Sequence, residues 1–560
     1  MAKKTRHAVK QVVVVKENAS TAFFKAHYVK ILLLVFIVYG FSLRAYHMDY
    51  VSIGLHNLKE NQHLSEALNF YNNGISIHRE VFFQSADKDI PYYEEYPQFP
   101  LIPYIGVVLW KIFGVSFWTM RLQIILFSLG TIPLSYAVTK KITGDEVLSL
   151  VTAGFMAIMP LNVFFGRNIQ PESPCLFLLL VFYYYFIKWS EDSGVANALY
   201  AGMSAALIGL LKISFLVPTL AVLPIIPYRR TLDDIKSARF RPYVGFLVIL
   251  VLPLYIWITK LTNINESLTE GSLHNIKPFD PFTLQYWQTN GATIMAFWQD
   301  NYSVPLGTAM FLGLLALLFV QQGRTRSFFL SYLGSFAVYM MIFSLYFYQH
   351  NYYQMPYVYL AAFSMAFAFH YLFTVIVKIR HLKYASFLIL LLSLYAVKDS
   401  TMRQYDRQFP GTDIAGEYIR SHTNRTDRFL VSASAQKLAV CYFAERFCFP
   451  LPAQEEEVKQ FEKKFNSKYI FIYNNSMPEA MSRSSWDYVS KNYKIAEAGV
   501  IHSGAAQDAS QGGGFAIAYL LLVKGGQFST DILNGKVPVL KKYYEFSYAN
   551  YPFYIIEPEK

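Results

Sequence analysis

Long apolar stretches recur along the first 400 residues, and each has about the length of a membrane-spanning helix. A helix rises about 1.5 Å per residue, so roughly 20 apolar residues cross the ~30 Å hydrocarbon core of a bilayer. The pattern predicts eleven spans, at residues 30–46, 118–138, 146–166, 172–190, 197–212, 213–227, 243–260, 305–321, 327–347, 355–377 and 384–398. The apolar segment 99–114 is short and holds two prolines and Lys111, so we interpret it as a juxtamembrane or re-entrant helix.

Beyond residue 398 the pattern changes to short apolar runs that alternate with amphipathic segments. Runs of strand length occur at 428–434, 468–475 and 516–525, and helical patterns occur at 413–422 and 455–465. This alternation predicts a small α/β domain. The glycines of the stretch 504–514 lack the strand and helix of a phosphate-binding fingerprint, so the stretch reads as a flexible loop.

Together these patterns predict a mostly α protein, a polytopic membrane helix bundle with a C-terminal external α/β domain. The expected parts are an N-terminal segment at 1–29, the membrane region at 30–398 with an external loop at 47–117, and the α/β domain at 399–560.

Lysine and arginine are distributed unevenly between the two sides of the predicted bundle. The side of the basic N-terminus carries thirteen: Lys140, Lys141, Lys188, Arg229, Arg230, Lys236, Arg239, Arg241, Arg324, Arg326, Lys378, Arg380 and Lys383. The opposite side of the same region carries four: Arg167, Lys212, Lys260 and Lys277. Because cytoplasmic segments are enriched in these residues, the bias predicts a cytoplasmic N-terminus and an external C-terminal domain. We expect a multi-pass protein of a cell membrane, such as a bacterial inner membrane.

Composition agrees with a membrane protein, since 54% of the 560 residues are hydrophobic and 17% are aromatic. The formal charge is +12, and we expect membrane lipids rather than nucleic acid around the chain. Cys175 lies in a predicted span. Cys441 and Cys448 lie in the external domain, where an oxidising compartment allows a disulfide, although free thiols fit equally well.

Unusual polar residues gather on the predicted external side. The stretch FFGRNIQPESPCLF places Arg167 and Glu172 between two spans, where charges in lipid cost a few kcal/mol each. YYEEYPQFP contributes Glu95, GLLKISFLVP contributes Lys212, and YQHNYYQMP contributes His350. Each residue alone fits a plainer explanation, such as a solvated loop, a snorkelling lysine or an interfacial aromatic belt. Their coincidence on one face favours a functional site.

The order of these motifs after HNLKENQHLSEALNFYNNG resembles a known family. The acidic, aromatic and proline motif, the following FG…R element and the GRxxxP-acid turn are similar to those of GT-C glycosyltransferases that use polyprenyl-phosphate sugars. That branch includes aminoarabinose transferases and protein mannosyltransferases. The resemblance covers about residues 25–400.

The resemblance implies transfer of a sugar from a polyprenyl-phosphate donor to a lipid, glycan or protein acceptor. It makes Glu60, Glu95 and Glu172 the candidate catalytic carboxylates, which orient the acceptor or take its proton. The candidate groups that hold the donor phosphate are Arg121, Arg167, Lys212, His350, Tyr352 and Tyr353.

The first loop departs from the family pattern. Related sequences often carry a tryptophan, an arginine and an acid there, whereas this chain has Leu58, Lys59, Glu60, Asn61 and Gln62. A divalent cation, Mg²⁺ or Mn²⁺, is a further option, with Glu60, Glu172 and Asp49 as candidate ligands. Two alternatives stay open: a transporter or lipid-handling protein lined by the same charges, and a non-catalytic member of the fold.

Overall fold

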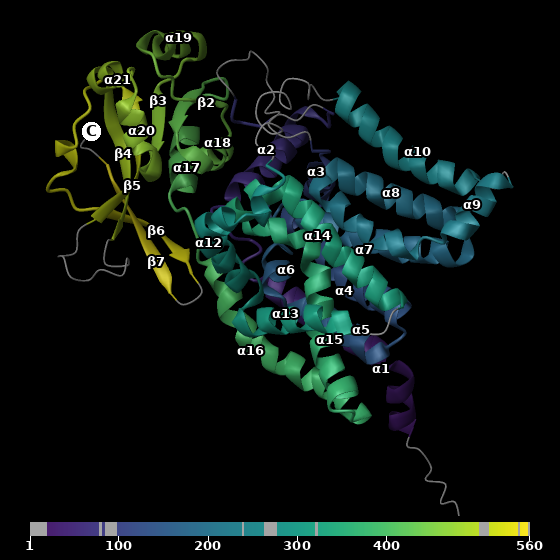
Figure 1. Ribbon diagram of the computed structural model, residues 1–560. Helices are drawn as coiled ribbons and strands as arrows, with labels where there is room; N and C mark the ends of the chain where they lie inside the picture. Colours follow the sequence, from purple (N-terminus) through teal and green to yellow (C-terminus); the bar gives the residue numbers. More distant parts are fainter. Residues whose placement is uncertain are drawn as a thin grey trace, which may run out of the picture.

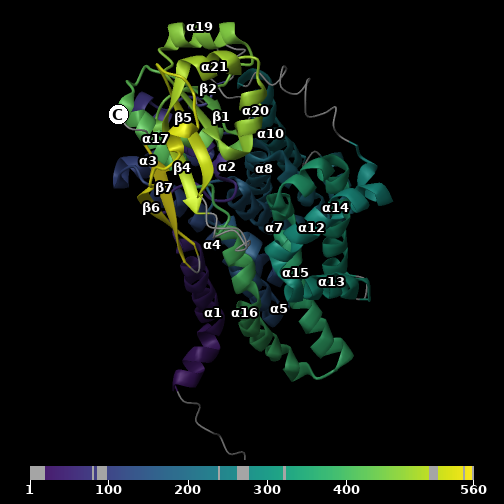
Figure 2. The ribbon, with the colours of Figure 1, turned by 90° about the vertical axis from the view of Figure 1, so that its left-hand side faces the viewer.

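The computed structural model describes residues 19–77, 81–84, 98–237, 240–261, 277–319, 323–502, 515–546 and 549–557. A long helical region is followed by a C-terminal region built on one β-sheet, which lies at one end of the helices (Figure 1, Figure 2). The predicted loop 504–514 lies outside the described residues.

The helical region confirms the predicted polytopic architecture. Its α-helices are α1 Ala19–Ala45, α2 Asn57–Asn73, α3 Leu101–Phe113, α4 Phe117–Thr143, α5 Glu146–Ile158, α6 Pro160–Phe164, α7 Glu172–Asp192, α8 Val195–Leu211, α9 Tyr228–Lys236, α10 Arg241–Ile256, α12 Leu284–Tyr302, α13 Val304–Phe319, α14 Arg324–Gln349, α15 Val358–Tyr371 and α16 Ala385–Tyr405. Shorter 3₁₀ and π segments include η1 Ile213–Ile225, η2 Trp257–Leu261, η5 Asn351–Tyr357, η6 Leu372–Ile376 and η7 Arg380–Tyr384.

Each predicted span coincides with described helix, but the number of crossings stays a prediction. By length and apolar composition, seven described helical segments are long enough to cross a bilayer, or eight if the bent pair α12 and α13 counts as one span. Four shorter apolar helices, α3, α5, α8 and η1, accompany them.

Three predicted elements differ in detail for local reasons. The span expected at 146–166 is broken into α5 and α6, because Pro160 has no amide proton and disfavours helical geometry in the residue before it. The span expected at 213–227 is a 3₁₀ helix with Pro218 and Pro224 inside it. The segment 261–304, which separates two predicted spans, contains α12, and α12 meets α13 at an angle of 98° at Ser303.

Close packing joins the central helices. A Cβ on Gly313 of α13 would lie 1.8 Å from the carbonyl oxygen of Ser364 in α15, so only glycine allows the two helices to approach this closely. Phe329 of α14 stacks on Phe363 of α15, with ring centroids 3.4 Å apart. These contacts hold α13 and α14 against α15.

Helix α3 occupies the segment predicted not to span. Its thirteen residues rise roughly 20 Å, which is too short for the hydrocarbon core. Ile102, Val107 and Trp110 pack into the same hydrophobic core as residues of the C-terminal sheet, such as Phe429 and Tyr519. Helix α3 therefore lies beside the C-terminal region at the end of the bundle.

The C-terminal sheet confirms the predicted α/β pattern. Its strands are β1 Phe429–Ser432, β2 Cys448–Pro450, β3 Tyr469–Tyr473, β4 Tyr493–His502, β5 Phe515–Lys524, β6 Val539–Glu545 and β7 Asn550–Ile556. Their order is β2-β1-β3-β5-β4-β7-β6, parallel between β1 and its two neighbours and antiparallel elsewhere. The accompanying helices are α17 Thr412–His422, α18 Lys437–Ala444, α19 Glu455–Phe465, α20 Met477–Ser482 and α21 Trp486–Asn492.

Alternate residues of the strands serve two cores. In β3, Phe471 packs in the core that contains α17 and α18, whereas Ile470 and Ile472 pack in the core that contains α19, α20 and α21. Successive side chains of a strand point to opposite faces, so both faces are covered by helices. Cys441 and Cys448 form a disulfide, which selects one of the two options open from the sequence.

The orientation in the membrane leads to a labelling prediction. We expect a cysteine introduced at the exposed position Lys463 of α19 to react with a membrane-impermeant maleimide in intact cells. A cysteine introduced at Lys236 of α9 should react only after permeabilisation, because the charge bias puts this position in the cytoplasm. Labelling of position 236 from outside would contradict the predicted topology.

Candidate active site

A first cluster forms around Glu60, near the start of α2. The carboxylate accepts hydrogen bonds from Ser52 Oγ at 2.8 Å, Arg121 Nη2 at 3.2 Å and the Ile169 amide at 3.1 Å. Burial alone would raise the pKa of Glu60, but the charges of Arg121 and Arg167 and the bond from Ser52 outweigh it and hold the pKa below its usual range. Glu60 is therefore ionised and held in one position.

Two buried arginines lie beside this carboxylate. Arg121 Nη1 donates to the carbonyls of Tyr50 and of Met48, the latter at 3.2 Å. Arg167 Nη1 donates to the carbonyl of Tyr46, and its guanidinium lies 4.4 Å above the ring centroid of Tyr405. Burial lowers the pKa of Arg167 to about 10, so it stays charged at neutral pH.

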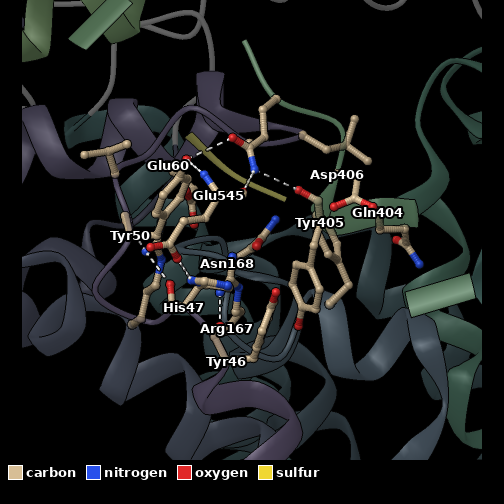
Figure 3. A pocket seen from close by; sticks show the side chains of 16 residues that line it. Tyr46, His47, Tyr50, Glu60, Arg167, Asn168, Gln404, Tyr405, Asp406 and Glu545 are labelled. Carbon is tan, nitrogen blue, oxygen red and sulfur yellow. Dashed lines mark hydrogen bonds and ion pairs between the residues drawn. The ribbon is translucent and has the colours of Figure 1, made fainter. Parts of the chain in front are cut away.

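These residues line a pocket between the helix ends and the C-terminal sheet (Figure 3). The enclosed cavity volume is only about 30 Å³, and the empty space rises to about 480 Å³ when the open mouth is included. The lining residues are Tyr46, His47, Tyr50, Val51, Gly54, Leu55, Glu60, Arg121, Phe164, Arg167, Asn168, Gln404, Tyr405, Asp406, Gln408 and Glu545.

The C-terminal region contributes directly to this pocket. The His47 ring lies 2.9 Å from the Glu545 carboxylate at the end of β6. Gln408 Nε2 donates to the Glu545 carbonyl at 2.7 Å, and the Glu545 amide donates to the Tyr50 hydroxyl at 3.0 Å. These contacts fasten β6 to the segment that follows α1.

A second cluster forms around Glu172, the first residue of α7. Glu172 is buried and makes an ion pair with Lys212, which follows the last turn of α8. The Lys212 ammonium lies 4.2 Å from the ring centroid of Tyr352 and 4.8 Å from that of Tyr353. His350 stacks on Tyr352 with ring centroids 5.0 Å apart. A lysine thus faces an aromatic platform built by η5.

His56 and the turn 166–171 join the two clusters. His56 Nε2 lies 2.7 Å from Asn351 Oδ1, and its ring contacts Tyr352 edge-on at 4.9 Å. Gln170 Nε2 donates to the His56 carbonyl at 3.3 Å, while Ile169 is held by Glu60. The turn that carries Arg167 at one end and precedes Glu172 at the other is therefore fixed by the start of α2.

Gly166 permits the tight path of this turn. A Cβ at this position would lie 2.4 Å from the Asn162 carbonyl and 2.5 Å from Arg44 Nε. The buried Arg44 also donates to the carbonyl of Ala157 at 2.9 Å and to Ser128 Oγ at 2.8 Å. It thus anchors α1 to the segment that leads into the site.

Both histidines near Lys212 are neutral at physiological pH. Burial lowers the pKa of His56 to about 3. The charges of Lys212 and Arg407, and the charge that His350 carries when it is protonated, act in the same direction, against the bond to Asn351. Burial and the charges of Lys212 and Lys59 lower the pKa of His350 to about 4. Lys212 therefore supplies the positive charge of this cluster.

This electrostatic arrangement makes stability depend on pH. Unfolded histidine takes up a proton near pH 6.5, whereas folded His56 does not until about pH 3. The stabilising contribution is therefore complete above pH 6.5 and is lost as pH falls below it, by at most about 1.4 kcal/mol per pH unit for one group. We expect the thermal unfolding temperature in detergent to fall between pH 7 and pH 5.

His56→Asn should make this decline shallower, because asparagine removes the titrating ring and tolerates the left-handed backbone (φ 63°) of this position. The window above pH 5 excludes Glu60, whose contribution is lost only below the unfolded carboxyl value of 4.5. An equal pH slope in wild type and variant would contradict the assignment.

The predicted site residues fall into these two clusters with two exceptions. Glu60, Arg121 and Arg167 form one group, and Glu172, Lys212, His350, Tyr352 and Tyr353 form the other. Glu95 lies outside the described residues. Asp49 is exposed near the mouth of the pocket, where its charge acts on His47.

The candidate metal ligands do not form a metal site in the described ranges. No three His, Cys, Asp or Glu side chains of this part of the chain lie close enough together to hold an ion. Glu60 is paired with Arg121 and Glu172 with Lys212, so each carboxylate already faces a cation. The divalent cation stays an option that rests on the chemistry of a phosphate leaving group.

Several contributors to the site were missed in the sequence, among them His56, Asn168, Tyr405 and Glu545. His56 and Asn168 lie inside the quoted motifs, but their residue types alone do not distinguish them from the other polar residues nearby in the sequence. Tyr405 and Glu545 are brought to the pocket only by the path of α16 and by the docking of β6. No local pattern could identify them.

Comparisons with known proteins agree with this architecture. Residues 96–257 match the model of the dolichyl-phosphate-mannose-protein mannosyltransferase family. The comparison with curated protein sequences finds no match.

Solved structures of membrane enzymes are similar to the chain over most of its length. An oligosaccharyltransferase of Archaeoglobus fulgidus, tethered to an acceptor peptide, matches with a TM-score of 0.55 and 13% identity, over 89% of this chain and 74% of that one. The same enzyme in complex with Zn and sulfate matches with a TM-score of 0.53 and 14% identity, over 87% and 73%. ArnT from Cupriavidus metallidurans matches with a TM-score of 0.52 and 12% identity, over 90% of this chain and 100% of that one.

The helix bundle, the C-terminal sheet and the similar solved structures together define the fold class. The chain has the GT-C fold of membrane glycosyltransferases. The family model covers the segment from the end of the EYP motif through Arg167, Glu172 and Lys212 to α10. The predicted GT-C fold is thereby confirmed, and the match to the mannosyltransferase family model over residues 96–257 agrees with the resemblance.

Proposed function

We propose that this protein is an integral membrane glycosyltransferase that moves a sugar from a polyprenyl-phosphate donor to an acceptor at the external face of the membrane. The observation that carries the proposal is the pocket under the C-terminal sheet, where two buried arginines meet one buried glutamate. When the acceptor attacks the anomeric carbon, the bond to the phosphate oxygen breaks and negative charge grows on the leaving group. Preorganised cations in a water-poor site stabilise that charge.

Arg121 and Arg167 are suited to hold the leaving phosphate. The guanidinium of Arg121 is fixed by two backbone carbonyls and by Glu60. Arg167 Nη2 has no hydrogen-bond partner within the described part of the chain, so it can donate to a phosphate oxygen in the pocket. Charge-assisted bonds of this kind are about twice as strong as neutral ones.

Lys212 and the η5 aromatics form the second half of the proposed donor site. The ammonium offers another cation, and the flat surface of Tyr352, Tyr353 and His350 suits the apolar face of a sugar ring or the first isoprene unit. In this assignment Glu172 orients Lys212 through their ion pair. The second carboxylate oxygen, Oε2, has no hydrogen-bond partner among the described residues.

Glu60 is the carboxylate best placed to receive the acceptor. A carboxylate has about four lone-pair positions, and three are occupied by Ser52, Arg121 and the Ile169 amide. The remaining position lies at the pocket wall and can accept the hydrogen bond and then the proton of an attacking hydroxyl or amine. Glu95 remains the second carboxylate proposed for this step.

The proposal is tested by comparing the glycans and lipids of the cell envelope by mass spectrometry in cells with and without the gene. We expect one glycosylated species to disappear on deletion and to return when the wild-type gene is restored, but not when the Glu60→Gln variant is expressed at the same membrane level. The proposal would be overturned if the envelope glycans and lipids were the same with and without the gene, although the protein is detected in the membrane of the wild-type strain.

A further inference from the structure

A second cavity lies at the end of the helices opposite the C-terminal sheet. It is lined by Asp145 in the turn before α5, His370 of α15, Thr374 of η6, Lys378 and Lys383. The cavity volume is about 390 Å³. The junctions of α4 with α5 and of α15 with α16 lie together at this end, far from the sheet, in both views of the chain (Figure 1, Figure 2).

The cavity has more positive than negative groups. Asp145, its one carboxylate, accepts from the Leu148 amide at 2.9 Å and pairs with Lys383 at 3.3 Å, so its charge is already matched. Lys378 is exposed and makes no ion pair with any described residue. His370 Nδ1 is buried and has no hydrogen-bond partner in the described ranges. An incoming anion would thus meet an uncompensated lysine and an unused ring nitrogen.

An apolar surface borders the same cavity. After α15 the chain passes through the π segment η6 and a short irregular stretch, and the cavity residues Thr374 and Lys378 lie in these two parts. The exposed apolar side chains of these two parts include Val375 at 47%, Ile376 at 62%, Val377 at 41% and Ile379 at 50%. Free inorganic phosphate has no apolar part that could cover this surface, whereas the acyl chains of a lipid can pack against it.

We propose that this cavity binds the phosphate headgroup of an anionic phospholipid, whose acyl chains lie along Val375, Ile376 and Ile379. Lys378 and His370 contact the phosphate, while Lys383 is held at the rim by Asp145. This end carries most of the basic residues predicted to face the cytoplasm, where the leaflet holds anionic lipids. The site is separate from the proposed sugar-transfer site and does not depend on it.

Lipid retention on the purified full-length protein tests the proposal. The protein is extracted from nanodiscs with equal amounts of phosphatidylglycerol and phosphatidylcholine, and the bound lipids are counted by native mass spectrometry. We expect wild type to retain phosphatidylglycerol selectively. Lys378→Asn should lower that retention by about fivefold, the usual effect of one basic residue at a membrane surface. Asparagine suits the left-handed backbone (φ 58°) at this position.

Lys236→Asn is the matched control, since it removes an equal charge from the last residue of α9, outside the cavity, and should leave retention unchanged. Lys378→Arg keeps the charge and should restore retention. Equal phosphatidylglycerol retention by the Lys378→Asn and Lys236→Asn variants would overturn the proposal.

A thermal unfolding series distinguishes the two sources of phosphate and serves as a second readout. Phosphatidylglycerol added to wild type in detergent should raise the unfolding temperature, whereas inorganic phosphate at equal concentration should not. Equal stabilisation by inorganic phosphate would assign the cavity to a free anion and overturn the lipid assignment. If Lys378→Asn failed to fold, lipid retention would be measured on Lys378→Ser instead. The effects of phosphatidylglycerol and inorganic phosphate on the wild-type unfolding temperature would test the proposal without any variant.

Discussion

Glu60→Gln is expected to lower sugar transfer by about 100-fold or more while the protein still reaches the membrane and binds donor. A neutral amide cannot take the proton of the acceptor, and general-base catalysis contributes roughly 10²- to 10⁴-fold. Glutamine also offers one oxygen where Glu60 uses two, so either Ser52 and Arg121 or the Ile169 amide loses its acceptor. Single-turnover transfer, measured beside donor affinity and thermal stability, separates these effects.

Glu172→Gln is the matched control for this experiment, because it makes the same chemical change in the other cluster. We expect it to weaken the hold on Lys212 but to keep transfer within about tenfold of wild type, since Lys212 can still bind phosphate. An equal loss of transfer in both variants would assign the proton to Glu172 or to both carboxylates. Wild-type transfer by Glu60→Gln would remove Glu60 from the chemistry.

Arg167→Ala is expected to weaken donor binding by more than about tenfold, which corresponds to about 1.4 kcal/mol for one lost charge-assisted contact. The variant also loses the contact with the Tyr405 ring and the bond to the Tyr46 carbonyl. Titration of the purified protein with a polyprenyl phosphate, followed by the change in unfolding temperature, gives the affinity.

Arg167→Lys is the informative companion, because it keeps the charge and loses the planar fork. We expect it to recover part of the donor affinity but little of the transfer rate, since a lysine cannot reproduce the position of the guanidinium above Tyr405. Near-normal donor binding by Arg167→Ala would move the phosphate to the Lys212 cluster.

The sequence predicted the helices and strands well, because their signals are local. Runs of apolar residues located the membrane-length helices, though not α9 or α12, and short apolar runs located β1, β3 and β5. Where the pattern was apolar but interrupted by proline, as in η1 and at Pro160, the type and continuity of the helix were not predicted. Apolar composition reports burial, whereas the exact backbone path depends on single residues and their neighbours.

The candidate site was only partly predictable. Arg167, Glu172 and Lys212 stand out because a charge between spans needs a partner, and Glu172 and Lys212 indeed pair with each other. The grouping of Arg121 with Glu60 depends on a contact across 61 positions of sequence, which no spacing rule reveals. Tyr405 and Glu545 come from still more distant segments, so only the folded chain identifies them as pocket residues.

The pocket wall also sets an order of events during biosynthesis. Glu545 lies on β6, and its contacts with His47, Tyr50 and Gln408 close one side of the pocket. Glu60, Arg121 and Arg167 precede β6 by more than 370 positions in the chain, so they are synthesised long before β6 leaves the ribosome. In a partly synthesised chain the side of the pocket formed by β6 is therefore still open. The pocket is complete only after the last strands of the sheet have been synthesised and folded.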